Sequence, residues 1–277
     1  MLLLALLQAT VLGIVEGITE FLPISSTGHL IVAGRLVGFE DPNFEIFIQF
    51  GAICAVLVMY RRDLWQRLCT GLRGGPNGLV LWNVVLAFLP AAVLGLLFHH
   101  HIKHYLFNPF TVALALIVGG LAIIALERRG LAAQTHDLDT MTARQALAVG
   151  IGQVLAMWPG FSRAAASILG GMVAGCDRRT ATLFSFYLAI PTMLGATVVA
   201  LASAGGGPAS GGGATDQLAL AAQLPTYTVG FVVSFGIAWL AIRGLLRYIA
   251  HHDFTAFGKY RIGLGAALLL MLWAGWL

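Results

Sequence analysis

Long apolar runs follow one another along almost the whole chain, interrupted by short clusters of basic residues. A helix needs about 20 predominantly apolar residues to cross the hydrocarbon core of a bilayer. Only 10% of the 277 residues are charged, whereas soluble domains contain roughly 25%. No hydrophilic block is large enough to form a separate soluble domain. We therefore expect an all-α integral membrane protein with a single membrane domain over residues 1–277.

The basic residues predict the topology, because in membrane proteins they mark the cytoplasmic side. They form four clusters: Arg61, Arg62, Arg67 and Arg73; Arg128, Arg129 and Arg144; Arg178 and Arg179; and Arg243, Arg247, Lys259 and Arg261. Placing all four clusters in the cytoplasm predicts six transmembrane helices, with both chain ends on the outer side. These helices cover residues 45–60, 79–98, 110–126, 180–203, 226–242 and 262–277. The outer loops are then residues 99–109 and 203–215, the second of which is rich in Gly and Ala and typical of a flexible linker.

Two further apolar stretches, approximately 2–38 and 145–177, must each leave and return on the same side for this count to hold. Each is broken in its middle by a Pro/Gly/Ser turn, at residues 23–28 and 159–162. Such breaks are typical of discontinuous helices at the membrane midplane. We therefore expect two re-entrant broken helical hairpins, the first entering from the outer side and the second from the cytoplasm.

A short internal similarity links the two hairpins. At an offset of 137 residues, Gly13 corresponds to Gly150, Ser25 to Ser162, and Glu16 to Gln153. With the opposite entry sides, this similarity predicts an inverted-topology repeat whose halves cover approximately residues 1–126 and 138–277. The repeat would bring the two hairpin breaks together.

Glu16 and Glu20 are ionisable groups inside an otherwise apolar segment, where a charge is costly unless it faces a polar cavity. Their spacing places them one helical turn apart on one face. Two carboxylates so close repel unless a proton or a cation offsets them, and Mg²⁺ or Ca²⁺ would suit their hard oxygen ligands. The alternative is a structural role, with both carboxylates hydrogen-bonded to neighbouring helices.

Polar residues on both hairpins have the chemistry of an anion site. After Pro23, a new helix start with Ser25, Ser26 and Thr27 would offer backbone N–H groups to phosphate oxygens, although these residues could simply be helix caps. His29 adds an acid or base, and Ser26 adds a nucleophile. In the second hairpin, Arg163 follows Ser162, and its planar guanidinium suits phosphate oxygens. The alternative for Arg163 is a structural ion pair with Glu16 or Glu20.

Carboxylates, hydroxyls, a histidine and an arginine within apolar walls are the equipment of phosphoryl transfer. A substrate that reaches such a site from the bilayer would carry a lipid tail. The sequence therefore predicts hydrolysis of a lipid phosphate or diphosphate. Gln49, in another apolar run, either hydrogen-bonds across helices or lines the site.

Over essentially its full length, the chain resembles the bacterial undecaprenyl-diphosphate phosphatases, the bacitracin-resistance protein family. The resemblance rests on Val15 to Pro23 (VEGITEFLP), Ser25 to His29 (SSTGH), Ile48-Gln49, Asn108-Pro109 and Trp158 to Arg163 (WPGFSR). It implies a polyprenyl-diphosphate substrate in the bacterial inner membrane, a divalent metal, a site opening to the periplasm, and a homodimer of interdigitated inverted repeats. Recycling of the carrier lipid for peptidoglycan synthesis, and bacitracin resistance, would follow; no nucleic-acid partner is expected.

By this resemblance, Glu16 and Glu20 are the family's catalytic and metal-binding E-x-x-x-E pair. Ser26 is its proposed nucleophile, and His29 its acid/base histidine. The diphosphate-binding residues are Ser162 and Arg163, and we add three neighbours from the two turns: Ser25, Thr27 and Gly160.

Two positions depart from the family pattern P-G-x-S-R-S-x-x-T, because Ala164 and Ser167 stand where Ser and Thr are usual. The loss of a hydroxyl at Ala164 puts any role of that position in doubt, whereas Ser167 keeps one. The signature of the unrelated type 2 phosphatidic-acid phosphatases is absent, since Leu169 and Val173 stand where it requires His and Asp.

A lipid flippase or secondary transporter is the competing interpretation, because inverted repeats and midplane carboxylates also occur there. A transporter needs no nucleophile, so the Ser-x-x-His and Ser-Arg elements favour an enzyme.

Overall fold

A computed structural model describes residues 2–72, 78–204 and 214–276, and this part of the chain is helical with no named strand. The helices of the first half are α1 (Leu2–Thr19), α2 (Ser26–Val37), α3 (Pro42–Leu72), α4 (Leu79–Leu106) and α5 (Pro109–Arg128). Those of the second half are α6 (Ala143–Gln153), α7 (Arg163–Val173), α8 (Arg178–Ala204), α9 (Ala214–Ile249) and α10 (Thr255–Trp273). Two short 3₁₀ helices, η2 (Leu138–Thr140) and η3 (Val154–Met157), flank α6.

Seven of the described helices are long and apolar enough to cross a membrane. Five of them contain a predicted span, and α10 covers the sixth, 262–277, as far as Trp273; the seventh is α1, the first arm of the first predicted hairpin. The all-α membrane fold is thus confirmed, and the protein is multi-pass.

Several predicted boundaries were wrong. The predicted outer loop at 99–109 is mostly helical, because α4 continues to Leu106, and α10 begins at Thr255 rather than near residue 262. A helix can continue beyond its apolar segment into the polar interface, so apolar runs mark the membrane part of a helix rather than its ends. Most of the predicted linker, residues 205–213, lies outside the described residues.

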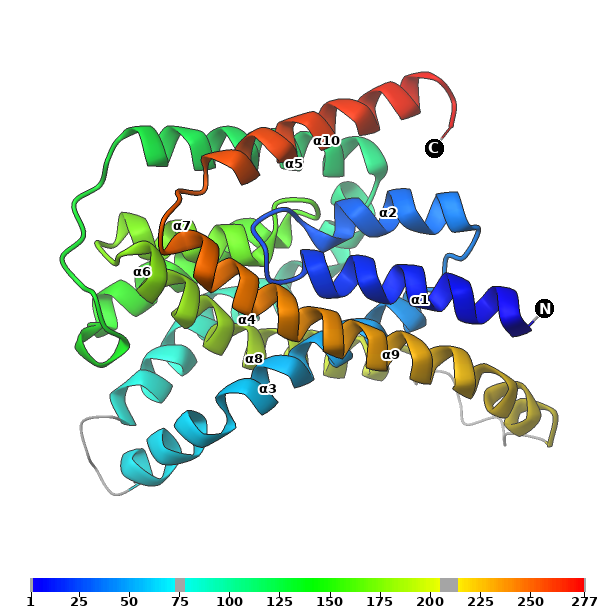
Figure 1. Ribbon diagram of the computed structural model, residues 1–277, viewed down its shortest axis with the longest axis horizontal. Coiled ribbons are helices and arrows are strands. Elements are labelled where there is room, and N and C mark those ends of the chain that lie inside the picture. The colour runs from blue at the N-terminus through cyan, green and yellow to red at the C-terminus, as the bar shows by residue number, and fades with distance from the viewer. Residues whose placement is uncertain (1, 73–77, 205–213, 277) are drawn as a thin grey trace.

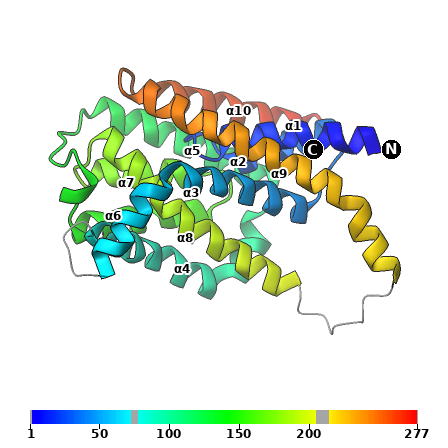
Figure 2. The same ribbon diagram turned by 60° about the horizontal axis from the view of Figure 1, so that its bottom comes forward.

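Close packing joins helices that are distant in the sequence. α1 and α3 both pack against α9, and α5 packs along α10 (Figures 1 and 2). Glycine allows the approach of α1: a Cβ atom at Gly17 would lie only 2.8 Å from the Ser234 carbonyl oxygen. Gly13, four residues earlier, faces α9 in the same way. Small residues at this spacing commonly let membrane helices approach each other closely.

Two helical hairpins reach the middle of the molecule from opposite ends (Figure 1). One consists of α1 and α2, and the other of α6, η3 and α7. Both are broken at a serine with positive φ, 74° at Ser25 and 72° at Ser162. These are the two serines that correspond at the 137-residue offset. The matched breaks agree with the expected repeat, while its inverted topology and its two halves stay predictions.

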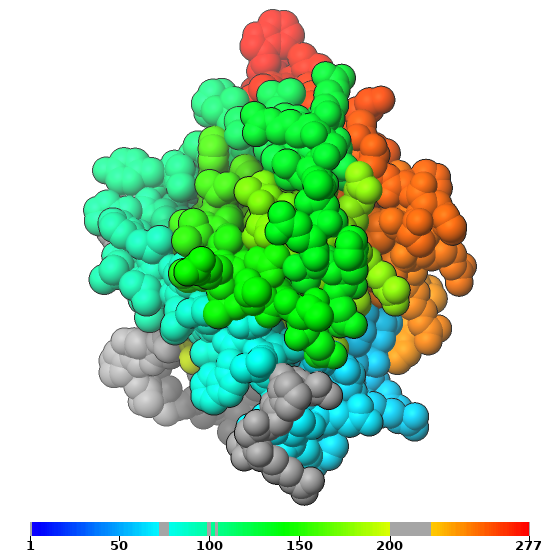
Figure 3. Space-filling view, turned by 90° about the vertical axis from the view of Figure 1, so that its left-hand side faces the viewer, coloured from blue at the N-terminus to red at the C-terminus, as the bar shows by residue number. Residues whose placement is uncertain are grey.

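The end of the molecule opposite the chain termini carries most of the basic clusters, since α3, α5 and α9 end there and α6 and α8 begin there (Figure 1). The segment between α5 and α6 covers this end (Figure 3). It is held by backbone hydrogen bonds from Thr135 to Gly175 and from Asp177 to Thr135. One basic residue was wrongly assigned to the cytoplasmic surface: Arg261 is 0% exposed.

Candidate active site

A cavity of about 780 Å³ lies where the two hairpin breaks meet. The first hairpin contributes Glu20 and the helix start of α2, and the second contributes the loop before α7 with Arg163. Glu20 and Arg163 are the charged residues among the described residues that line it. The predicted site residues on its wall are Glu20, Ser25, Ser26, Thr27, Gly160, Ser162 and Arg163.

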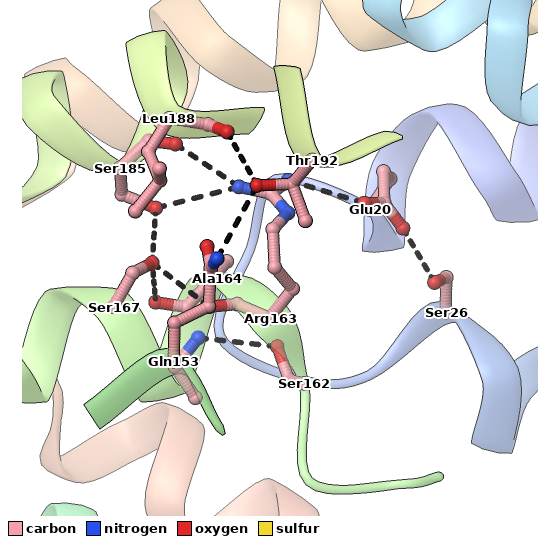
Figure 4. Close-up of polar contacts among 11 residues, drawn as sticks. Glu20, Ser26, Gln153, Ser162, Arg163, Ala164, Ser167, Ser185, Leu188 and Thr192 are labelled. Atoms are coloured by element: carbon pink, nitrogen blue, oxygen red, sulfur yellow. Dashed lines mark hydrogen bonds and ion pairs between the residues drawn. The ribbon is translucent and has the colours of Figure 1, made fainter. Parts of the chain in front are cut away.

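Glu20 joins the two hairpins. Its Oε2 accepts a hydrogen bond from the Ser26 hydroxyl at 2.6 Å, and its Oε1 accepts one from Arg163 Nη2 at 3.1 Å (Figure 4). The carboxylate is 6% exposed, and the Arg163 side chain is 10% exposed. A short hydrogen bond from a hydroxyl to a carboxylate is the arrangement in which a base can accept the hydroxyl proton.

Arg163 is held from its other side by α8. Its Nη1 donates to the Ser185 carbonyl oxygen at 3.1 Å, and the Ser185 hydroxyl is hydrogen-bonded to Ser167 at 2.7 Å (Figure 4). Ser167 also donates to the Arg163 carbonyl oxygen at 2.8 Å, so the hydroxyl at this departure from the family pattern supports Arg163 rather than facing the cavity. Ala164, the other departure, is 0% exposed. Arg163 Nε is buried without a partner among the described groups, so the guanidinium keeps an unused donor for an anion.

Both hairpins present a helix start to the cavity. Ser25 caps α2, and its hydroxyl accepts from the Gly28 N–H at 3.4 Å; Ser162 caps α7 in the same way and accepts from the Ala165 N–H at 3.2 Å. The first N–H groups of a helix lack partners within the helix, and they carry positive partial charge. Two such starts on one cavity favour an anion with two charged groups.

Gly160 is required for the shape of the second break. Its φ is +95°, and a Cβ atom there would lie 2.5 Å from the Val112 carbonyl oxygen. A side chain would therefore be strained as well as crowded.

Glu16 lies one turn before Glu20 but is not among the residues that line the cavity. It is 1% exposed, and neither of its carboxylate oxygens has a hydrogen-bond partner among the described residues. An unpartnered buried carboxylate is costly, so a cation or a proton fits this position. No group of three or more His, Cys, Asp or Glu side chains that could hold a metal occurs in the described residues. Such an ion would therefore need ligands beyond the two glutamates.

His29 is not among the cavity-lining residues either. Its Nδ1 lies 2.6 Å from the Ser25 carbonyl oxygen, and its Nε2 lies 2.7 Å from the Tyr260 hydroxyl. A carbonyl only accepts, so Nδ1 carries a proton. In the neutral ring with its proton on Nδ1, Nε2 accepts a hydrogen bond from the Tyr260 hydroxyl. Both ring nitrogens are thus occupied, and the ring braces the backbone of the α2 start.

Arg261 of α10 is a buried cation that sequence reasoning missed. Its guanidinium donates to Pro23 O at 3.2 Å and to Gly160 O at 3.1 Å, which belong to the two hairpin breaks. It also donates to Ala115 O and Leu116 O of α5. Gly119 makes room for it, because a Cβ atom there would lie 2.1 Å from Nη2. In the sequence, the adjacent pair Gly119-Gly120 favours close helix packing but does not identify the packing partner.

Two glutamines complete the polar wall. Gln49 of α3 lines the cavity, as one of its two predicted roles requires. Gln153, which corresponds to Glu16 at the 137-residue offset, lines it as well and donates to the Thr192 hydroxyl at 3.2 Å. Its Oε1 is buried without a partner among the described groups. The offset with Glu16 was the one signal in the sequence for Gln153.

Comparisons with known proteins show which family the chain resembles over its length. Residues 9–267 match the family described as bacitracin resistance protein BacA. A protein of Albidiferax ferrireducens named undecaprenyl-diphosphatase is 48% identical, over 98% of this chain and 96% of its own length. Proteins with the same name from Laribacter hongkongensis (46% identical, 99% and 97% covered) and Methylobacillus flagellatus (47% identical, 98% and 99% covered) are similar over comparable lengths.

Proposed function

The chain belongs to the bacitracin resistance protein BacA family, and we propose that it is an undecaprenyl-diphosphatase. It hydrolyses undecaprenyl diphosphate to the monophosphate and inorganic phosphate, which recycles the carrier lipid for peptidoglycan synthesis and confers resistance to bacitracin. The observation that carries this function in the structure is the chain of contacts from Ser26 to Glu20 to Arg163, which faces a cavity bounded by two helix starts.

The cavity binds the diphosphate through groups on both hairpins. The N–H groups at the starts of α2 and α7 and the free Nε of Arg163 receive the phosphate oxygens. Ser25, Thr27, Gly160 and Ser162 shape the two turns that present these donors. Donors fixed before the substrate arrives stabilise the charge that develops on the transferred phosphoryl group without reorganising.

Glu20 accepts the proton in the reaction, since the Ser26 hydroxyl already donates to it. In one route, Ser26 Oγ attacks the terminal phosphorus and its proton passes to Glu20. The bond from that phosphorus to the bridging oxygen then breaks, and undecaprenyl monophosphate leaves; water later hydrolyses the phosphoserine. In the other route, a water attacks the terminal phosphorus directly and its proton passes to Glu20, without a role for the Ser26 hydroxyl. His29 holds the α2 start in place in both routes.

Glu16 and Glu20 are the residues that would hold a divalent cation, Mg²⁺ or Ca²⁺. The unpartnered oxygens of Glu16 fit a hard cation, and Mg²⁺ in particular is often bound by one or two carboxylates together with substrate phosphates and water. When bound, the ion would neutralise charge on the diphosphate. It would also remove the repulsion between the two carboxylates.

We place the protein in the bacterial inner membrane with the basic end of the helices in the cytoplasm. The termini and the outer halves of α4 and α8 then face the periplasm, and the active site opens to that side. A homodimer is expected from the family resemblance. The bilayer supplies the lipid substrate, and the flippase alternative is not favoured, because transport requires neither the Ser26–Glu20 pair nor a nucleophile.

Phosphate release from undecaprenyl diphosphate by the purified protein tests this function. We expect release that a chelator abolishes and that Mg²⁺ or Ca²⁺ restores. Release that is unaffected by the chelator would contradict the metal assignment alone. Absence of release under any metal would contradict the function and favour a transporter.

Ser26→Ala separates the two chemical routes in the same assay. The covalent route predicts a loss of at least about 100-fold in kcat, because the nucleophile is removed. Wild-type kcat in this variant would exclude the covalent route and leave direct attack by water.

A further inference from the structure

The cavity extends beyond the polar groups of the hairpin breaks, between α4 and α8. On α4, the lining residues are Phe88, Ala91, Ala92, Gly95 and Leu96. Their spacing is that of one helical face. This wall contains no polar side chain, and three of its five residues are Gly or Ala.

The opposite wall, on α8, changes from polar to apolar along the chain. Thr192 lies at the polar end, where it receives the hydrogen bond from Gln153. Gly195, Ala196 and Val199 follow one and two turns later and also line the cavity. We call the part of the cavity between these two helix faces the apolar arm.

The apolar arm ends at an apolar rim. Leu96, Val198 and Phe107 line the cavity there, and they are 70%, 65% and 64% exposed. Leu96 and Val198 belong to helices that are long and apolar enough to span the membrane. The cavity therefore meets the surface at an apolar rim near the ends of the two candidate spans of α4 and α8.

We propose that the apolar arm binds the first isoprene units of the substrate, and that the prenyl chain passes between α4 and α8 into the bilayer. This inference rests on the proposed function, since it assigns the tail of the same substrate. The arm is continuous with the cavity end that holds Arg163 and Glu20, so a tail attached to a bound diphosphate has this apolar path open to it. A cavity of this volume accommodates a ligand of limited size, so most of a long prenyl chain remains in the lipid.

Gly95 supplies a direct way to fill the arm. A Cβ atom built at Gly95 meets no atom within 4 Å, so a larger side chain enters space that the protein leaves open. Gly244 on α9 is a matched control: it is also helical and open within 4 Å, but it does not line the cavity.

The experiment compares farnesyl diphosphate with isopentenyl diphosphate as substrates of the wild type, Gly95→Leu and Gly244→Leu. The short substrate has a single isoprene unit, which reaches little of the arm. We expect Gly95→Leu to lower kcat/KM for farnesyl diphosphate by at least about tenfold, or about 1.4 kcal/mol, mainly through KM. For isopentenyl diphosphate we expect little change, and for Gly244→Leu wild-type values with both substrates.

An unchanged ratio between the two substrates in Gly95→Leu would overturn the proposal, whether both activities fall or neither does. Ala196→Leu fills the arm from the opposite wall and must shift the ratio in the same direction, which keeps the test decisive if Gly95→Leu does not fold. Failure of the wild type to hydrolyse undecaprenyl diphosphate is a separate result and would instead refute the proposed function.

Discussion

The two oxygens of the Glu20 carboxylate have different partners, Arg163 on the second hairpin and Ser26 on the first. A carboxylate that accepts a hydrogen bond from a hydroxyl is placed to accept its proton. One side chain therefore couples the position of the second hairpin to the Ser26 hydroxyl of the first. The sequence left two interpretations of Arg163, a structural ion pair and a site residue. The contact between Arg163 and Glu20 fits both of them.

His29 gives a prediction that separates positioning from acid/base catalysis. An asparagine can keep a donor near the Ser25 carbonyl oxygen, which His29 Nδ1 now approaches to 2.6 Å, but it cannot titrate near neutral pH. We expect His29→Asn to retain most of the wild-type phosphate release with an unchanged pH profile, and His29→Ala to lose at least about tenfold, since the α2 start loses its brace. Equal inactivity of the two variants would assign His29 to proton transfer.

Most of these residues could be predicted from the sequence, because ionisable and hydroxyl groups inside apolar segments are conspicuous. Glu20, Ser26 and Arg163 were found in this way. The surroundings of His29 could not be, since Tyr260 is 231 positions away and a sequence pattern does not show which ring nitrogen is occupied. Arg261 was misjudged for a related reason: an arginine near a basic cluster looks cytoplasmic until the carbonyl groups that surround it are known.

At the scale of the helical elements, α10 holds the two hairpin breaks in place through Arg261. Its guanidinium is bonded to one carbonyl of each break, at Pro23 and Gly160. Hydrogen bonds to a charged group contribute about 1.5–3 kcal/mol each. The active site therefore depends on a helix that contributes none of the described cavity-lining residues.

Gly119→Ala tests this dependence without removing the arginine, because the new methyl group would lie where the guanidinium now is. We expect a destabilisation of at least about 2 kcal/mol, with the thermal midpoint in detergent lowered by about 4 °C or more. Phosphate release should fall as well. Gly263→Ala on α10 is the control, because a Cβ atom at Gly263 meets no atom within 4 Å; its stability and activity should match those of the wild type. A Gly119→Ala protein with wild-type stability and activity would show that Arg261 does not organise the breaks.

The hairpin breaks themselves were predictable, since Pro, Gly and Ser interrupt apolar runs at both. The ends of α4 and α10 were not, because helices continue beyond the apolar residues that reveal them. The pairing of α1 with α9 and of α5 with α10 depends on close contacts at glycines, and many glycines in the chain are equally plausible candidates.

At the scale of the whole molecule, two hairpins from opposite ends bring one half of the site each. Glu20 and Ser26 come from the first and Arg163 from the second, and the cavity between them continues between α4 and α8. By the proposed tail path, a lipid diphosphate reaches Glu20 and Ser26 without its tail leaving the bilayer. This division of the site between hairpins is the central claim of the account.

A double-mutant cycle on kcat/KM for undecaprenyl diphosphate, with Glu20→Gln, Arg163→Gln and the double variant, tests that claim most directly. Each single change should lower kcat/KM by at least about 100-fold, because each disables the same unit. The kcat/KM of the double variant should then be about as low as that of the more impaired single variant. Losses that multiply in the double variant, or single variants with wild-type kcat/KM, would contradict a site shared between the two hairpins.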